Sequence, residues 1–211
     1  MKAILSPSSS FNTGNNDKNL IIHKHGNGRL YYRIAMNCAP SSLQLNEANY
    51  GFKIERIYTA IDDPSHVHKQ SDGTWKFKLQ NKIKVTLIMT TTQRRYHVAL
   101  VDYLPAGCEP LNTKLKGTLT GDTNSSVARS KRNDYYDGRR PYSTIGWTEH
   151  ENLRDERAEA FRSLLWPGVY QWSYVMRATC AGTFIMPPAK AEEMYSPENF
   201  GRCATEKAII N

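Results

Sequence analysis

The sequence lacks a long hydrophobic stretch. No apolar run among its 211 residues approaches the ~20 residues that a membrane-spanning helix needs. The first residues, MKAILSP, also lack the apolar segment of a secretory signal. We therefore expect this segment to be soluble and to make no membrane contact, and we expect any export signal of the natural protein to lie upstream of Met1.

Cysteine pairs at metal-binding spacing are also missing. The four cysteines are widely separated, at Cys38, Cys108, Cys180 and Cys203. Without a CxxC pair, a thiolate zinc site is not predicted. An even number of cysteines permits two disulfides, and four free buried thiols fit the sequence equally well.

Histidine offers little more to a metal ion. The pairs His23/His25 and His66/His68 would each place two rings on one face of an extended strand. Neither pair has a third ligand nearby in the sequence, so we interpret both as structural or exposed histidines. No metal and no cofactor is predicted.

Acidic residues are outnumbered, because 28 Lys and Arg stand against 20 Asp and Glu and give a formal net charge of +8. Nucleic-acid binding would need these charges clustered on one face. Lysines 76, 78, 82 and 84 alternate along strand-like segments, which is typical of a solvated face. The densest basic stretch, residues 129–140, has a net charge of only +3 because it includes Asp134 and Asp137. We predict no nucleic-acid partner.

Alternating side chains are what the sequence has in abundance. Trp75, Phe77 and Leu79 alternate with polar residues, and the same period of two returns from Ile83 to Met89. Asp72-Gly73 and Gln80-Asn81 are turn signals that predict hairpins around these runs. Further strands are expected at residues 20–22, 30–36, 96–101 and 184–186. The fold class is therefore predicted to be all-β, an antiparallel β-sandwich.

Residues 157–166 are ambiguous, because alanine, glutamate and leucine favour a helix. The segment continues through Pro167-Gly168 into 169–175, where aromatic and β-branched residues alternate. We predict two long strands joined as a hairpin.

Several blocks in order resemble the last domains of bacterial-type alpha-2-macroglobulins. The blocks are GRLYYR (28–33), YGF (50–52), YHVALVD (96–102), LPAG (104–107), HENLRDER (150–157) and PPAKAEEMY (187–195). Residues 6–19 are rich in Ser and Asn, which predicts a flexible segment over residues 1–19. The resemblance implies the closing strands of a CUB-type domain at 20–45 and a C-terminal macroglobulin-like β-sandwich at 46–211. It departs mainly at the polar stretch 118–146, which carries a glycosylation sequon at Asn124.

In that family a protease cleaves a bait region, and a thioester formed by a Cys-x-Glu-Gln motif then acylates the protease. No cysteine of this chain begins such a motif. The resemblance therefore implies a non-catalytic C-terminal module of an endopeptidase inhibitor, a protease trap of innate defence. Its partners would be the upstream thioester and CUB-type domains and, through the full-length protein, target proteases. Its location would be secreted, periplasmic or at the cell surface.

The resemblance also implies a lid. Met194 and Tyr195 match a Met-Tyr pair that covers the thioester and excludes water and small amines before activation. The alternative is that both residues anchor the C-terminal loop on their own domain.

Two other functions fit the residues. Trp147, Trp166 and Trp172 could form the binding surface of a stand-alone β-sandwich that recognises protein or carbohydrate, although we interpret them as core residues. His150 and Asp155 could serve a hydrolase, but no nucleophile or oxyanion donor accompanies them. We instead assign Arg154, Asp155, Glu156 and Arg157 to a structural ion-pair network and predict no enzymatic activity.

Overall fold

A computed structural model describes residues 25–29, 31–32, 41–111 and 146–211. Residues 39–211 belong to one compact unit. Its described part contains strands and one short 3-10 helix but no α-helix, so no helix there could cross a membrane. The elements are β1 (Ala48–Tyr50), β2 (Lys53–Ala60), η1 (Pro64–His66), β3 (Val67–Lys69), β4 (Trp75–Phe77), β5 (Lys82–Thr91), β6 (Arg95–Tyr103), β7 (Cys108–Leu111), β8 (His150–Arg154), β9 (Arg157–Leu165), β10 (Gly168–Ala178), β11 (Gly182–Met186), β12 (Lys190–Glu193), β13 (Ser196–Arg202) and β14 (Glu206–Ile210).

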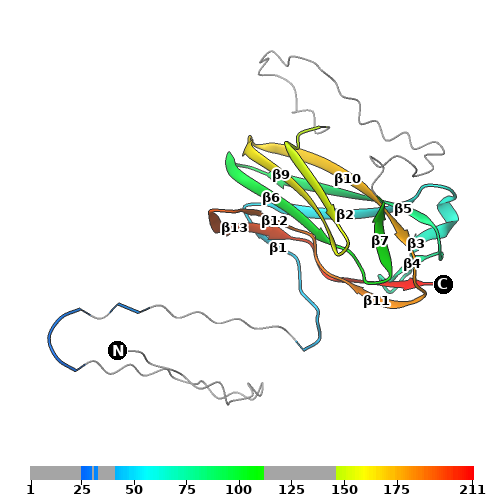
Figure 1. The fold of residues 1–211 in the computed structure, drawn as a ribbon, viewed down its shortest axis with the longest axis horizontal. Helices are drawn as coiled ribbons and strands as arrows, with labels where there is room; N and C mark the ends of the chain where they lie inside the picture. The colour runs from blue at the N-terminus through cyan, green and yellow to red at the C-terminus, as the bar shows by residue number, and fades with distance from the viewer. Residues whose placement is uncertain (1–24, 30, 33–40, 112–145) are drawn as a thin grey trace, which may run out of the picture. The chain divides into compact units, whose positions relative to one another are not determined.

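The strands form three sheets, and the six-stranded sheet and one of the four-stranded sheets make the sandwich (Figure 1). One has six strands in the order β1-β13-β12-β6-β9-β8, and the other has four in the order β2-β5-β10-β7. The third, β11-β14-β4-β3, lies at the end of the domain where the chain finishes. Side chains from all three sheets meet in one hydrophobic core. The predicted all-β sandwich is confirmed.

The period of two in β5 places one face of the strand in this core. Ile83, Val85, Leu87 and Met89 are fully buried, whereas the residues between them are exposed or half-buried. Each such side chain contributes about 1.5–3 kcal/mol on burial. The hydrophobic faces of β5 and its neighbours β2 and β10 thus build one layer of the sandwich.

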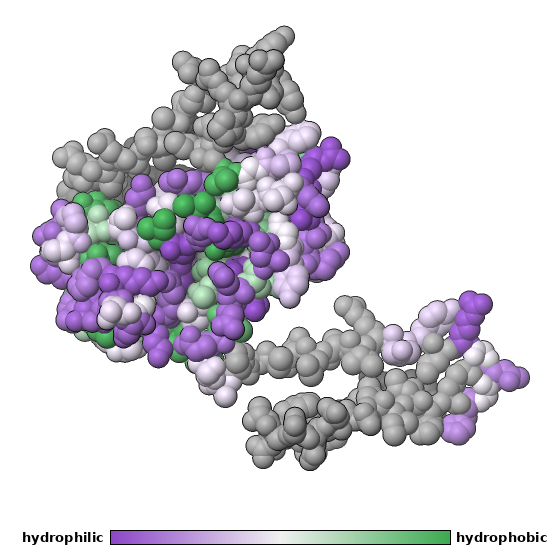
Figure 2. Space-filling view, turned by 180° about the vertical axis from the view of Figure 1, so that it is seen from behind, coloured by the Kyte–Doolittle hydropathy of each residue, from purple (hydrophilic) through white to green (hydrophobic). Residues whose placement is uncertain are grey.

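The outer surface is mostly polar, as the alternation requires. Figure 2 shows one face of the molecule, where hydrophilic residues dominate and the hydrophobic patches are separate and small. Lys84 is exposed and Lys76 and Lys82 are half-buried. These lysines lie on strands in the way that the solvated-face interpretation expects.

One predicted hairpin is wrong. Gln80-Asn81 does not join β4 to β5 as neighbours, because β5 pairs with β2 and β10 while β4 pairs with β3 and, in parallel, with β14. Gln80 adopts a positive φ of 64° and its amide donates to Ala178 O, so the chain turns from one sheet to another. Alternation reveals which face of a strand is buried but not which strand it pairs with. One partner of β4 is β14, which lies about 130 residues away in the sequence. The other turn, Asp72-Gly73, does join the antiparallel pair β3–β4.

The strand assignment of 157–175 is confirmed, against its helix propensity, but the hairpin is wrong. β9 pairs with β6 and β8, whereas β10 pairs with β5 and β7 in the other large sheet. The link at Trp166-Pro167 therefore crosses between the two sheets. β9 forms backbone hydrogen bonds with β6 on one side and β8 on the other. This pairing outweighs the helix propensity of the segment, which amounts to a few tenths of a kcal/mol per residue. The strands expected at 20–22 and 30–36, the sequon at Asn124 and most of the polar stretch 118–146 lie outside the described residues.

A buried charged group links the three sheets. Arg56 Nη1 on β2 donates to Asp102 Oδ1 on β6 at 2.7 Å and to Pro187 O at 2.8 Å. Tyr174 OH on β10 donates to Asp102 Oδ2 at 2.9 Å, and Arg56 Nη2 lies 3.5 Å from Glu206 Oε2 on β14. Burial raises the pKa of the Asp102 carboxyl, although Arg56 and Tyr174 act to lower it. Hydrogen bonds to both carboxylate oxygens offset part of the cost of burying the charge.

We expect Asp102→Ala to lower the free energy of unfolding by about 3–5 kcal/mol, because it leaves the Arg56 guanidinium buried without its main partner. Urea denaturation measures this change. The matched control is Glu55→Ala, which removes an exposed ion pair with Lys53 on the same strand β2 and should cost below about 1 kcal/mol. Equal losses in the two variants would contradict the structural role of the buried pair.

Candidate functional site

Met194 and Tyr195 form the tip of the hairpin between β12 and β13. Glu193 pairs with Ser196 across the tip, after an irregularity in the register between Glu192 and Glu193. β12 also pairs with β6, with Lys190 opposite Val101 and Glu193 opposite Val98. The hairpin is therefore held from both sides of β12, and only its two-residue tip extends beyond the paired strands.

The Glu193 side chain fastens the base of this tip. Its Oε1 accepts a hydrogen bond from the Tyr96 amide at 2.7 Å, and its Oε2 accepts one from Asn199 Nδ2 at 2.7 Å. The carboxylate is buried, and Arg95 Nη1 lies 3.7 Å from it. A charged acceptor with two donors forms a strong anchor, since charge-assisted hydrogen bonds are about twice as strong as neutral ones.

The backbone at the start of β6 completes the mount. His97 has a positive φ of 49°, and its carbonyl oxygen accepts a hydrogen bond from the Met194 amide at 2.9 Å. The His97 ring meets the Tyr195 ring edge-on, with centroids 5.1 Å apart and planes at 90°. No local pattern in the sequence predicts these contacts, because His97 and Glu193 are brought together only by the pairing of β6 with β12.

The tip itself points away from the core of its domain. The exposed fraction is 46% for Met194 and 81% for Tyr195. An exposed thioether beside an exposed aromatic ring can cover a group on another surface and exclude water from it. The two side chains thus have a rigid mount and free apolar faces.

Further exposed aromatic residues lie at this end of the sandwich. Tyr96 opens β6 beside the tip, and Trp166 follows the end of β9, the neighbour of β6. The Arg94 guanidinium lies 5.2 Å from the Tyr96 ring centroid and 5.7 Å from that of Trp166. Figure 1 shows the β12–β13 tip and these ends of β6 and β9 on the same side of the domain. The surface around the tip is therefore aromatic with one cation among the rings.

The residues assigned to an ion-pair network do not lie at the β12–β13 tip but at the tight turn between β8 and β9. They are Arg154, Asp155, Glu156 and Arg157. Asp155 and Glu156 form the turn, and Arg157 contacts Glu156 at 2.7 Å. The centre of the cluster is Glu159, which the sequence interpretation missed. Arg157 and Arg154 lie 2.5 and 3.5 Å from it, whereas Asp155 forms no ion pair with any other described residue. Glu159 could have been found from the strand assignment, since it shares a face with Arg157.

The turn is also tied by its backbone to the chain just after β6, because the Leu104 amide donates to Glu156 O at 3.0 Å. His150 begins β8 and Asp155 follows its end, so the strand separates them by more than about 13 Å. They cannot share a proton across that distance. The His150 ring instead lies 5.8 Å from the Phe161 ring.

The tryptophans are mostly core residues. Trp147 and Trp172 are buried, and their indole nitrogens donate to Gln171 O and Glu151 Oε1. Trp166 is partly exposed, contrary to the expectation that it is a core residue, because it stands at the crossing between the sheets. The three do not form one exposed binding surface.

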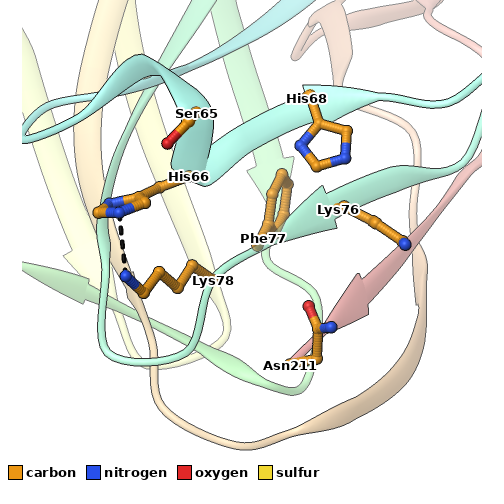
Figure 3. A pocket seen from close by; sticks show the side chains of 7 residues that line it. All are labelled: Ser65, His66, His68, Lys76, Phe77, Lys78 and Asn211. Atoms are coloured by element: carbon orange, nitrogen blue, oxygen red, sulfur yellow. Dashed lines mark hydrogen bonds between the residues drawn. The ribbon is translucent and has the colours of Figure 1, made fainter.

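Figure 3 shows the pocket that contains His66 and His68, a cavity of about 240 Å³ lined also by Lys76, Phe77 and Lys78. The predicted shared face of the histidine pair is wrong, because His66 ends the 3-10 helix η1 and only His68 lies on β3. The Nε2 atom of His66 lies 3.1 Å from Lys78 Nζ and must accept the hydrogen bond, because the ammonium group can only donate. Within the described ranges, no group of three or more His, Cys, Asp or Glu is placed to hold a metal ion. His23 lies outside them.

Comparison with known proteins identifies the domain. Residues 51–198 match the family model described as the bacterial alpha-2-macroglobulin MG10 domain. The chain belongs to this family. An alpha-2-macroglobulin from Xylella fastidiosa is 31% identical over 187 residues, which is 88% of this chain and 10% of the relative. A homolog from Nostoc is 27% identical over 195 residues, or 90% of this chain and 9% of the relative.

Solved alpha-2-macroglobulins share the fold of this MG10 domain. Escherichia coli alpha-2-macroglobulin activated by porcine elastase aligns with 79% of this chain and 14% of its own at a TM-score of 0.60 and 22% identity. Salmonella alpha-2-macroglobulin reacted with methylamine aligns with 82% of this chain and 10% of its own at 0.58 and 21%.

A relative with a different name also matches. "Circularly permutated Ras protein 2" from Dictyostelium discoideum is 31% identical over 196 residues, or 91% of this chain and 4% of the relative. The MG10 chain thus spans a tenth or less of the length of each of these curated relatives.

We expect Glu193→Ala to loosen the tip without unfolding the domain. Loss of two charge-assisted hydrogen bonds should speed amide exchange at Tyr96 and Met194 by roughly tenfold or more. Hydrogen exchange followed by mass spectrometry measures this rate. The control is Glu192→Ala, one residue away, whose side chain is partly exposed and bonded to Lys190. Unchanged exchange at Met194 in Glu193→Ala would show that the carboxylate is not the anchor.

Proposed function

We propose that this chain is the non-catalytic C-terminal module of an alpha-2-macroglobulin-like endopeptidase inhibitor, and that Met194 and Tyr195 shield a thioester on an upstream domain. Membership of the MG10 family supports the trap. The exposed Met194-Tyr195 tip on its anchored hairpin is the observation that carries the lid. A pair buried in its own core could not cover a group elsewhere.

The chemistry of a lid fits these two side chains. A thioester is attacked by water and by small amines, so its lifetime depends on excluding both from the acyl carbon. Met194 and Tyr195 offer an apolar thioether and a ring, and neither contributes a charged group that would attract water. The mount by Glu193 and His97 keeps the pair in place until a movement of the whole domain withdraws it.

The remaining assignments form part of the same proposal. Residues 1–19 would be a flexible segment, 20–45 would close a CUB-type domain, and 46–211 would form the MG10 sandwich. The upstream thioester and CUB-type domains would be its intramolecular partners, and proteases would be bound only by the full-length protein. The location would be secreted, periplasmic or at the cell surface. The cluster around Arg154, Glu156, Arg157 and Glu159 would serve structure and not catalysis.

A second candidate is a stand-alone protein- or carbohydrate-binding module. The match to a Dictyostelium protein whose name mentions no macroglobulin favours it, since such a domain could be used outside a trap. The burial of Trp147 and Trp172 weighs against the tryptophan surface that this function would use. A Cys-x-Glu-Gln motif upstream of Met1 in the gene would favour the trap, and its absence would favour the module.

We expect Met194→Ala combined with Tyr195→Ala to speed inactivation by methylamine in a longer parent protein that carries the thioester. Removal of both side chains should raise the rate by tenfold or more, because a loss of about 1.4 kcal/mol of protection corresponds to tenfold. Loss of inhibitory activity over time measures it. The control is Tyr103→Ala, which removes an exposed aromatic ring at the other end of β6. An unchanged rate in the double variant would remove the lid.

The isolated chain should fold and yet inhibit no protease, because it contains no thioester motif. Residual activity of trypsin and elastase on a protein substrate, with the chain in tenfold excess, measures inhibition. Substantial inhibition by the chain alone would contradict the proposal that inhibition requires the upstream domains.

A further inference from the structure

Cys108 begins β7, and Cys180 follows the end of β10, the strand that pairs with β7. Cys108 is opposite Ala178 in the register, and Cys180 follows Ala178 by two residues. Cys180 lies just past the last paired residues, so the two cysteines lie at the same end of the β7–β10 ladder. Electrostatic coupling between them supports this proximity, since Cys180 contributes to the raised pKa of Cys108.

The turn after β10 bends towards Cys108. The amides of Thr179 and Cys180 both donate to Gly107 O, at 2.8 and 3.2 Å, whereas a regular ladder would direct only one of them there. The hydrogen bond from the Cys180 amide to Gly107 O links the two cysteines, since Gly107 directly precedes Cys108. With standard bond lengths, this link limits the distance between the Cα atoms of Cys108 and Cys180 to about 7.5 Å or less. Disulfides join Cα atoms about 4.4–6.8 Å apart, so a small movement of the turn at most is needed.

Packing holds Gly107 in this arrangement. A Cβ on Gly107 would lie 2.4 Å from the Phe184 ring and 2.9 Å from Ile210, so only glycine fits. Gly107, whose carbonyl receives both amides, is therefore packed directly against side chains of β11 and β14. The part free to move is Cys180, which is exposed, whereas Cys108 is buried.

We propose that Cys108 and Cys180 form a reversible disulfide that fastens β7 to the turn between β10 and β11. β7 is the edge strand of its sheet and has only four residues, one of them Pro110, so it has few hydrogen bonds of its own. The cross-link closes a ring of about 70 residues, which reduces the entropy of the unfolded chain and stabilises the fold. The proposed disulfide does not depend on the proposed function as a protease trap.

The chemistry balances with a low-molecular-weight disulfide as the oxidant. The exposed Cys180 thiolate attacks one sulfur of that disulfide and releases a thiolate, leaving a mixed disulfide on Cys180. The Cys108 thiol then loses its proton to solvent and attacks the Cys180 sulfur, releasing the second thiolate. Two cysteine thiols are oxidised and one disulfide is reduced to two thiols. Burial raises the pKa of Cys108 to about 12, so the second step is the slow one.

The test incubates the 211-residue chain with oxidised glutathione at pH 8 and maps its peptides by mass spectrometry without reduction. We expect a linked pair of peptides containing Cys108 and Cys180, lighter by two hydrogen atoms than the free peptides. The thermal midpoint should rise by roughly 5 °C or more relative to the reduced chain. Dithiothreitol should reverse both changes.

Variants separate this cross-link from other cysteine chemistry. Cys180→Ser should abolish the linked peptide and the thermal shift, and Cys38→Ser should keep both. Glutathione that stays on Cys180 while Cys108 remains free would overturn the proposal, as would a link from Cys180 to Cys38 or Cys203. The wild-type comparison of oxidised with reduced chain needs no variant, so the result stands even if a substitution impairs folding.

Discussion

The buried contact between Arg56 and Asp102 joins the two large sheets where neither charge can reach water. Because Tyr174 donates to Asp102 and Arg56 Nη1 also donates to Pro187 O, a shift of one sheet against the other would break these buried hydrogen bonds. Hydrophobic contacts tolerate small sliding, whereas this geometry does not. The contact therefore fixes β6, which carries Asp102 near one end, relative to β2 and β10.

The start of β6, at the opposite end of the strand from Asp102, contacts the candidate site. Tyr96 and His97 lie at the start of β6 and hold Glu193 and Met194 by backbone hydrogen bonds. Pro187, whose carbonyl accepts a hydrogen bond from Arg56, precedes β12 by three residues and places the beginning of the same hairpin. The tip with Met194 and Tyr195 is thus tied at both ends to one frame, which supports a lid that moves with the domain and not within it.

The alternating side chains were enough to predict the fold class, because a period of two in segments such as Ile83 to Met89 has one physical explanation. The pairing of strands was harder. Gln80-Asn81 and Pro167-Gly168 were both interpreted as hairpin turns, but at each of them the chain crosses between sheets, since a short turn does not reveal which strands pair beyond it. His66 was misplaced for a similar reason, because a single 3-10 turn at Pro64 interrupts the extended run.

The candidate site, like the fold, was predicted from the sequence only in part. Met194 and Tyr195 were named from the family blocks, and no local pattern distinguishes them from an ordinary turn. Glu193, which organises the tip, was missed because its partner Tyr96 lies on another strand. Glu159 was missed although its partner Arg157 lies two residues away on the same strand and face.

Photo-crosslinking from position 195 in a longer, thioester-bearing parent tests the central claim most directly. A photoreactive phenylalanine in place of Tyr195 would be irradiated before and after protease activation, and the linked peptides would be identified. The lid predicts a cross-link to the thioester-containing peptide before activation that is lost afterwards. Cross-links confined to residues 46–211 in both states would contradict it.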